Sequence, residues 1–269
     1  MARVSVVEIL SIEQCATYPY TTIVLQLTLT SNLGSSLQKA DFFILDPRFP
    51  NRLNTSGYTK TIKFVQSLFT EYAQAGLSKE SDREIAISGL LQRMDHAFKS
   101  EHRYGIFECF ISRLLLWRVS GNGNGNGVNG GAVDRSLPSW SWMTHNRIEF
   151  FPEGKIKILR GSIKFGSGAK LVAPIRRLQN CKIKQRGNSY VIQDRNSHDV
   201  GELWFDGQAS TTVKDCVVVG MQDLSDLSQD PNGCFFLLLS TYDNHYQRIG
   251  AGHIEARCLS KDYWKGAIV

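Results

Sequence analysis

The stretch LPSWSW (Leu137–Trp142) marks the point at which the sequence pattern changes from helical to β. Trp140 and Trp142 are separated by one residue, so on a β-strand both side chains would face the same side of a sheet. Together they bury a large apolar area, and each buried indole N–H needs an acceptor. We therefore expect the two tryptophans to lie in the core, packed between the sheet and the helices. An exposed platform for a ligand or partner is the alternative.

Downstream of this stretch, short apolar runs recur along the chain. They are separated by Gly, Asn, Asp or Pro, the residues that most often form turns. Many short strands with frequent turns are typical of an antiparallel sandwich or barrel. Residues 137–269 are therefore predicted to form a β-rich domain. Its predicted strands are Ile148–Phe151, Lys155–Leu159, Ser162–Phe165, Tyr190–Gln193, Glu202–Phe205, Cys216–Gly220, Phe235–Ser240 and Ile249–Ile254.

Upstream, residues 58–120 show helical periodicity. Apolar residues recur every three or four positions over Tyr58–Tyr72, and Gly76 would end this helix. Ser81–Glu84 has the capping-box pattern that begins a second helix, and the apolar spacing of Ile106–Trp117 predicts a third. The expected fold class is α+β, with a three-helix section in the N-terminal and middle part followed by an antiparallel β-rich section.

Two other segments carry weaker patterns. Residues 1–57 form an N-terminal segment with short strands predicted at Leu25–Thr30 and Phe42–Leu45. Residues 121–136 are a flexible loop rich in Gly and Asn. A G-x-G-x-x-G pattern begins in that loop at Gly125. It predicts no dinucleotide site, because the motif needs a strand before it and a helix after it, whereas here a helix precedes and a proline follows.

The chain of 269 residues has a formal net charge of +6, and basic residues are dense between residues 155 and 186. Clustered basic charge is the electrostatic signature of a nucleic-acid binder. The spacing is also that of a strand, so the solvated face of a sheet explains half of these charges equally well. Nucleic-acid binding is therefore kept only as an alternative. The residues concerned are Lys155, Lys157, Arg160, Lys164, Lys170, Arg176, Arg177, Lys182, Lys184 and Arg186.

The six cysteines are widely separated and form no C-x-x-C pair, which argues against a zinc site or a thioredoxin-like motif. We expect no cofactor. Cys109, Cys216 and Cys234 have apolar neighbours in sequence, where free cysteine acts as a small hydrophobe. A reducing compartment fits best, and we expect the cytoplasm with the nucleus as the alternative. The apolar runs are too short to span a membrane, so no membrane association is expected.

Common reaction motifs are missing from the sequence. It contains no Walker A, H-E-x-x-H or G-x-S-x-G motif, and its six histidines lack metal-ligand spacing. No catalytic, cofactor-binding or metal-binding residue is therefore predicted. His145, three residues after Trp142, is the histidine that an enzymatic alternative would use with a nearby acid.

Five segments in the same order resemble the C-terminal portion of fungal heterokaryon-incompatibility (HET) proteins. The most specific is Pro138-Ser139-Trp140-Ser141-Trp142. The others are Tyr72–Gly89, Tyr104–Gly105 together with Leu115–Trp117, Gly201–Asp206, and Tyr246–Gly250. Met143 and Thr144 depart from the family, which usually has small residues there. The resemblance covers about residues 58–256.

The motifs of the HET domain itself are absent, and residues 1–57 match none of them. In that family the HET domain looks related to TIR-type folds and is associated with triggering cell death. The resemblance therefore brings no catalytic residue to this chain. It implies a non-enzymatic module that acts in non-self recognition and programmed cell death by binding a protein partner. The structural or interaction residues it implies are Trp117, Pro138, Ser139, Trp140, Trp142, Tyr246 and Arg248.

Three alternatives to this role stay open at the level of sequence. The first is a degenerate or truncated gene product without activity. The second is a basic β domain that binds nucleic acid. The third is an enzyme with a site near His145.

Overall fold

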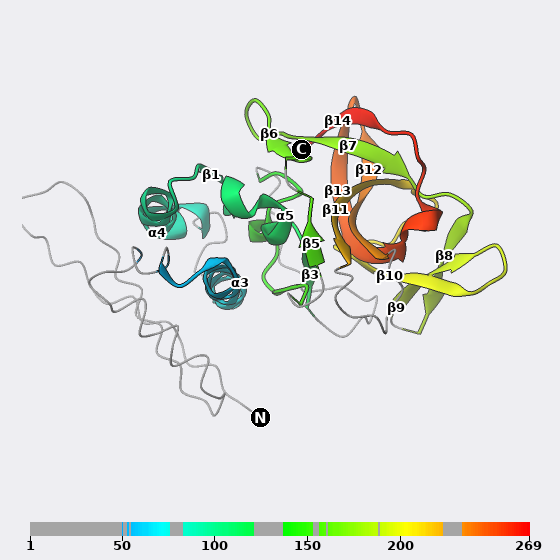
Figure 1. Ribbon diagram of the computed structural model, residues 1–269, viewed down its shortest axis with the longest axis horizontal. Helices are drawn as coiled ribbons and strands as arrows, with labels where there is room; N and C mark the ends of the chain where they lie inside the picture. Colours follow the sequence, from blue (N-terminus) through cyan, green and yellow to red (C-terminus); the bar gives the residue numbers. More distant parts are fainter. Residues whose placement is uncertain are drawn as a thin grey trace, which may run out of the picture. The chain divides into compact units, whose positions relative to one another are not determined.

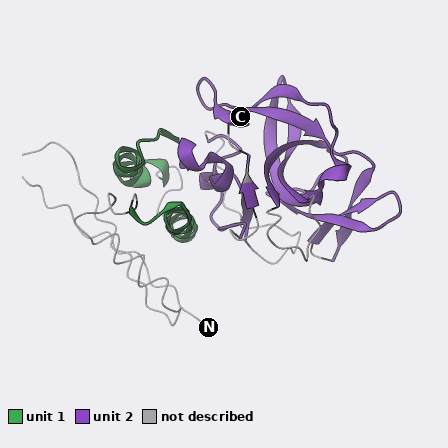
Figure 2. Ribbon diagram, viewed as in Figure 1, with its two compact units in different colours: residues 1–102 green, residues 103–269 purple. Residues whose placement is uncertain are grey.

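The computed structural model describes residues 50, 53, 55–75, 83–120, 137–152, 156–159, 161–187, 189–222 and 233–269. The chain divides into two compact units, residues 1–102 and residues 103–269 (Figure 2). The division falls within the predicted helical segment and places residues 103–120 in the same unit as the β-rich region. The strands predicted at Leu25–Thr30 and Phe42–Leu45, the Gly/Asn loop, and the capping residues Ser81 and Asp82 lie outside the described residues.

The described helices of the first unit are the two that the apolar spacing predicts, α3 (Tyr58–Gln74) and α4 (Arg83–Phe98). A reciprocal pair of hydrogen bonds joins the end of α3 to the start of α4. The Tyr72 hydroxyl donates to the Arg83 carbonyl over 2.7 Å, and the Arg83 guanidinium donates to the Ala73 carbonyl over 3.1 Å. Burial raises the pKa of Tyr72 to about 12, so this hydroxyl stays protonated as a donor at neutral pH.

The second unit holds the third helix and the β-rich region. After β1 (His102–Arg103), at the division between the units, come β2 (Ile106–Phe107), η2 (Glu108–Phe110), α5 (Ile111–Leu114) and β3 (Trp117–Val119). Next come η3 (Trp142–Thr144), β4 (Ile148–Phe150), β5 (Ile156–Ile158), β6 (Lys164–Phe165), β7 (Leu171–Arg177), β8 (Cys181–Arg186) and β9 (Ser189–Asp194). The remaining elements are β10 (Asp199–Phe205), β11 (Asp215–Gln222), β12 (Gly233–Tyr242), β13 (His245–Glu255), η5 (Ala256–Cys258) and β14 (Trp264–Ile268).

Five strands of the second unit close into a barrel in the order β12-β11-β7-β14-β13, because β13 pairs back onto β12 (Figure 1). The pairings are antiparallel except that of β13 with β14. β13 also pairs with β10, and β9 and β8 continue the sheet from there to an edge at β8. The predicted α+β fold with an antiparallel, barrel-like β-rich section is confirmed, and every predicted strand after residue 137 has a counterpart.

One apolar cluster of the second unit joins residues of three barrel strands with residues of β8, β9 and β10. Phe236, Leu238 and Ile254 belong to it, with Leu203 from β10 and Ile192 from β9. Three cysteines, Cys216, Cys234 and Cys258, are buried in the same cluster, and Cys181 packs against it. Cys216 and Cys234 therefore act as small core hydrophobes, as their apolar neighbours in sequence predict.

Two local expectations, the extent of the third helix and the burial of Cys109, are wrong. The third helix is only α5, because Ile106 and Trp117 lie in strands β2 and β3. This segment lacks the alternation of polar and apolar residues that would indicate a strand, because four consecutive residues are buried: Leu114, Leu115, Leu116 and Trp117. Cys109 is exposed, since it lies in η2, where its chain neighbour Phe110 turns inward instead.

The tryptophan pair does not lie on a strand. Residues after Pro138 form a turn in which Ser141 N–H donates to the Pro138 carbonyl over 2.9 Å. Ser141 then caps the short helix η3, where its hydroxyl accepts from the Met143 N–H over 3.1 Å. Trp140 therefore lies in the turn and Trp142 in η3, so the one-residue spacing does not put them on one face of a sheet.

Among the described residues, no helix is long and apolar enough to cross a membrane.

The cysteines should differ sharply in reactivity with a thiol reagent. Burial raises the pKa of Cys181 to about 11 and also raises the pKa of Cys216, so little of the reactive thiolate exists at pH 8. Among the five cysteines that the structure describes, Cys109 is the exposed one and should react first. Alkylation with N-ethylmaleimide followed by peptide mapping would measure each site separately. Labelling of Cys216 as fast as Cys109 in the folded protein would contradict this core.

Candidate functional site

The most unusual polar group in the second unit is the fully buried guanidinium of Arg248. Its side chain is 0% exposed and pairs with Asp206, whose side chain is 8% exposed. Nε donates to Asp206 Oδ2 over 2.8 Å and Nη2 to Asp206 Oδ1 over 3.1 Å, a two-pronged contact. Nη1 and Nη2 also donate to the carbonyls of Leu115 and Trp117, over 2.7 and 2.6 Å.

The indole ring of Trp117 covers the guanidinium, whose central carbon lies 3.4 Å from the ring centroid. Burial lowers the pKa of Arg248, and the Asp206 carboxylate opposes that shift. A buried charge is tolerated only when it is paired and hydrogen bonded, and all these contacts meet that requirement. We call Arg248, Asp206 and the groups bonded to them the Arg248 junction.

Ser139 joins the LPSWSW stretch to the barrel at the Arg248 junction. Its hydroxyl accepts from the Arg248 N–H over 2.9 Å and donates to the Val269 carbonyl. Its own N–H donates to the same carbonyl over 3.1 Å, and the Val269 N–H donates to the Tyr246 carbonyl over 2.8 Å. One serine thus bonds to the chain at β13 and to the residue that follows β14.

The three tryptophans next to the junction are each 0% exposed, and each indole N–H has a backbone acceptor. Trp117 donates to the Trp140 carbonyl and Trp140 to the Ala169 carbonyl, both over 3.2 Å. Trp142 donates to the Gly105 carbonyl over 3.0 Å. Full burial of the rings and a backbone acceptor for each indole N–H are what a position in the core predicts. An exposed platform for a ligand is incompatible with both.

The turn at Tyr104 and Gly105 is shaped to receive Trp142. Gly105 has a φ of +77°, and a Cβ there would lie 2.5 Å from the Trp142 Nε1. Glycine is therefore required for both its backbone conformation and its lack of a side chain. The Ser141 hydroxyl donates to the Tyr104 carbonyl over 2.9 Å, so two consecutive residues of the LPSWSW stretch bind this turn.

His145, the residue of the enzymatic alternative, also belongs to the structural network. Its Nε2 donates to the Asp206 carbonyl over 2.9 Å, and its Nδ1 lies 2.8 Å from the Thr144 hydroxyl. The ring centroid lies 5.3 Å from that of Trp117. Both ring nitrogens are thus engaged within the chain, and the geometry gives His145 a structural position.

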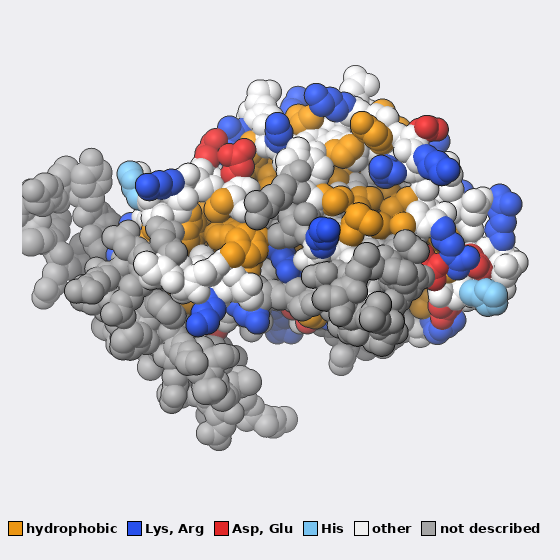
Figure 3. All heavy atoms as spheres, in the orientation of Figure 1, with side chains coloured by type: hydrophobic (Ala, Val, Ile, Leu, Met, Phe, Trp, Pro, Cys, Tyr) orange, Lys and Arg blue, Asp and Glu red, His pale blue; other side chains and the backbone are white. Residues whose placement is uncertain are grey.

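The described basic residues between 155 and 186 are spread over β5, β6, β7 and β8 and the residue before β7. Lys155 and Arg160 lie outside the described residues. Arg186 is paired with Asp199, whose second carboxylate oxygen lies 3.0 Å from its Nη2. On the face shown in Figure 3, Lys and Arg side chains are scattered among acidic and apolar ones. Nothing in this arrangement favours the nucleic-acid alternative.

Two of the basic residues have a clear structural use. Lys182 and Lys184 are exposed on β8, which is the edge strand of the sheet. Charged side chains on an edge strand discourage pairing with another chain. Strand spacing rather than a binding stripe therefore accounts for this part of the basic run.

The sequence-predicted residues come together around Arg248, whose main partner is Asp206. Trp117, Ser139, Trp140, Tyr246 and Arg248 are joined directly or through one residue at the Arg248 junction. Pro138 is buried at the start of the turn, and Trp142 packs at its far end. Sequence reasoning misses Asp206, because a single aspartate at the end of a strand pattern carries no signal of a buried pair.

Comparisons with known proteins add no relatives. No family model, no curated protein and no solved structure matches the chain.

The ion pair at the junction should show strong coupling. Arg248→Met leaves Asp206 buried and uncompensated, which should cost about 3–5 kcal/mol of unfolding free energy. The double variant Arg248→Met with Asp206→Leu should cost clearly less than the sum of the two single changes, because no charge is then left unpaired. Urea denaturation followed by tryptophan fluorescence would measure all four proteins. If the double variant lost as much unfolding free energy as the two single variants together, the pair would not be formed.

The buried tryptophans should contribute far more stability than an exposed one. Trp140→Ala is expected to cost about 3–5 kcal/mol, since the ring is 0% exposed. Trp264→Ala is the matched control, because that ring is 37% exposed, and it should cost about 1 kcal/mol or less. Equal losses in thermal or urea unfolding would place Trp140 outside the core.

Proposed function

We propose that this protein is a non-enzymatic binding module like the C-terminal part of fungal HET proteins. Its role in this proposal is non-self recognition and programmed cell death, exerted by binding a protein partner. The observation that carries the proposal is the convergence of the resembling segments. Groups from Tyr104–Gly105, Leu115–Trp117, Pro138–Trp142, Gly201–Asp206 and Tyr246–Gly250 bond to one another around the Arg248 junction.

Segments that resemble a family by chance have no reason to meet in space. Here a motif-bearing arginine bonds to a motif-bearing aspartate and serine from distant parts of the chain. The remaining segment, Tyr72–Gly89, lies in the first unit. There the side chains of Tyr72 and Arg83 form the hydrogen bonds that join α3 to α4. The residues of the resemblance thus have a common physical use, which is to hold each unit together.

The same geometry favours binding over catalysis. A catalytic group must reach the reacting atoms and carry an available proton or lone pair. Arg248 and the three indoles are instead buried and hydrogen bonded within the chain, and the Ser139 hydroxyl both donates and accepts within it. The residues that resemble the family therefore build a scaffold, and any recognition falls to the surface that this scaffold carries.

The full chain should turn over neither NAD nor ATP. Its rate of cleavage is expected to equal that of a heat-denatured sample, measured by chromatography of the nucleotides. His145→Ala and His198→Ala provide the matched pair of variants, since His198 has a 74% exposed side chain outside the junction. A turnover that His145→Ala abolishes and His198→Ala leaves unchanged would overturn the proposal in favour of an enzyme.

The recognition role is tested in fused fungal cells. Survival after fusion of unlike strains is measured with and without expression of the full chain, with protein level checked by immunoblot. The proposal expects survival to depend on the chain in at least one combination of strains. Equal survival in all combinations, with the protein present, would contradict it.

A further inference from the structure

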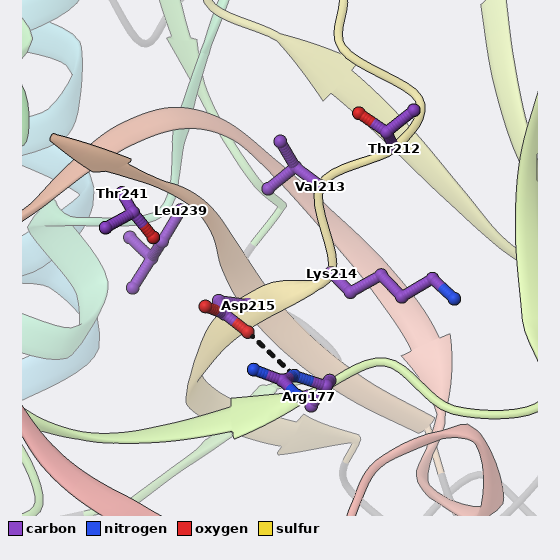
Figure 4. A pocket seen from close by; sticks show the side chains of 7 residues that line it. All are labelled: Arg177, Thr212, Val213, Lys214, Asp215, Leu239 and Thr241. Atoms are coloured by element: carbon purple, nitrogen blue, oxygen red, sulfur yellow. Dashed lines mark hydrogen bonds and ion pairs between the residues drawn. The ribbon is translucent and has the colours of Figure 1, made fainter.

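A pocket of about 430 Å³ opens beside the barrel strands β7, β11 and β12 (Figure 4). Asp215 is the register partner of both Arg177 on β7 and Leu239 on β12, so these three residues form one row across three strands. Leu238 belongs to the apolar cluster, so its neighbour Leu239 faces the other side of β12. The pocket is therefore separate from that core.

The lining of the pocket has an apolar part and a polar part. Val213 provides apolar surface, whereas Leu239 is fully buried, and Thr212 and Thr241 provide hydroxyls. Figure 4 shows the Arg177 and Asp215 side chains together at one edge, with Leu239 and Thr241 to one side. The Lys214 side chain extends away from this pair, so Arg177 supplies the positive charge at the edge.

Arg177 is held from two sides. Its Nε donates to Asp215 Oδ1 over 3.1 Å, and its central carbon lies 5.5 Å from the Trp264 ring centroid. Trp264 is itself fixed by a 3.0 Å hydrogen bond from its Nε1 to the Tyr246 hydroxyl. A Cβ on Gly266 would lie 2.9 Å from Cε2 of Tyr246, so this glycine lets the tyrosine ring reach across β14.

The two terminal nitrogens of Arg177 form no hydrogen bond in the part of the chain that the structure describes, and the side chain is 56% exposed. A guanidinium held through Nε still presents two parallel donors to a carboxylate. Its position is fixed before binding, so less conformational entropy is lost when the carboxylate arrives.

We propose that this pocket binds an acidic peptide segment of a partner protein. One carboxylate of the segment binds the terminal nitrogens of Arg177, and a neighbouring apolar side chain packs on Val213. The choice of a protein segment rests on the proposed function. The choice of acidic and apolar chemistry rests on the pocket alone. A nucleic acid fits less well, because its successive phosphates need a row of cations, whereas Arg177 alone supplies the positive charge at this edge.

The probe is a fluorescein-labelled pool of nine-residue peptides that combine Asp or Glu with Leu, Val or Phe. Binding to the full chain is followed by fluorescence anisotropy. Arg177→Gln is expected to weaken binding about tenfold to a hundredfold, the usual effect of losing hydrogen bonds to a charged group. Lys184→Gln is the matched control, because it removes the same charge from the exposed edge strand β8 and should change nothing.

A second variant and a second probe make the result decisive. Thr241→Trp, which fills the pocket from an exposed position on β12, should weaken binding as Arg177→Gln does, with unchanged thermal unfolding of both variants. Failure of the wild-type chain to bind the pool, or equal loss in Lys184→Gln, would overturn the proposal. Tighter, Arg177-dependent binding of single-stranded DNA of equal charge would also overturn it, in favour of a nucleic-acid site.

The outcomes separate this pocket from the proposed function. Arg177-dependent peptide binding without any effect of the chain on cell survival would keep the pocket and reject the recognition role. Chain-dependent survival without peptide binding would do the reverse.

Discussion

The buried ion pair between Arg248 and Asp206 is the constraint on which the rest of the second unit depends. A guanidinium removed from water needs an acceptor for each of its donors, and here the acceptors come from β10's end and from the segment after α5. That segment must therefore lie against β13. A shift of β13 by one residue would turn the arginine towards the apolar cluster, so the pair also specifies the register of the barrel.

Much of this fold follows from local pattern, and the failures have physical reasons. The strands after residue 137 that alternate apolar and polar residues between turns were predictable. β7 and β8 were not, because β7 contains Pro174 and ends in two arginines, and β8 buries only Ile183. β14 was missed as well, since Gly266 weakens its pattern although the glycine is needed for Tyr246 to pass.

The site was predictable as a set of residues but not as a set of contacts. The resemblance pointed to Arg248, Ser139 and the tryptophans without showing that they touch. Asp206 reaches Arg248 because β10 pairs with β13, and its N–H donates to the Ile249 carbonyl over 2.9 Å. Such a pairing arises from long-range topology, which periodicity does not report. The pocket at Arg177 is hidden for the same reason, since its row of residues spans three strands.

Closure of the barrel also has a consequence for the order of events during synthesis. The ring is completed only when β14 pairs with β7, and Trp264 is the register partner of Ile175. Until β14 has left the ribosome, β7 presents an open edge to which a neighbouring nascent chain could add a strand. The second unit should therefore complete its folding late and in one step. A ribosome that stalls before β14 is made would carry an aggregation-prone intermediate, which the folding machinery of the cell would encounter.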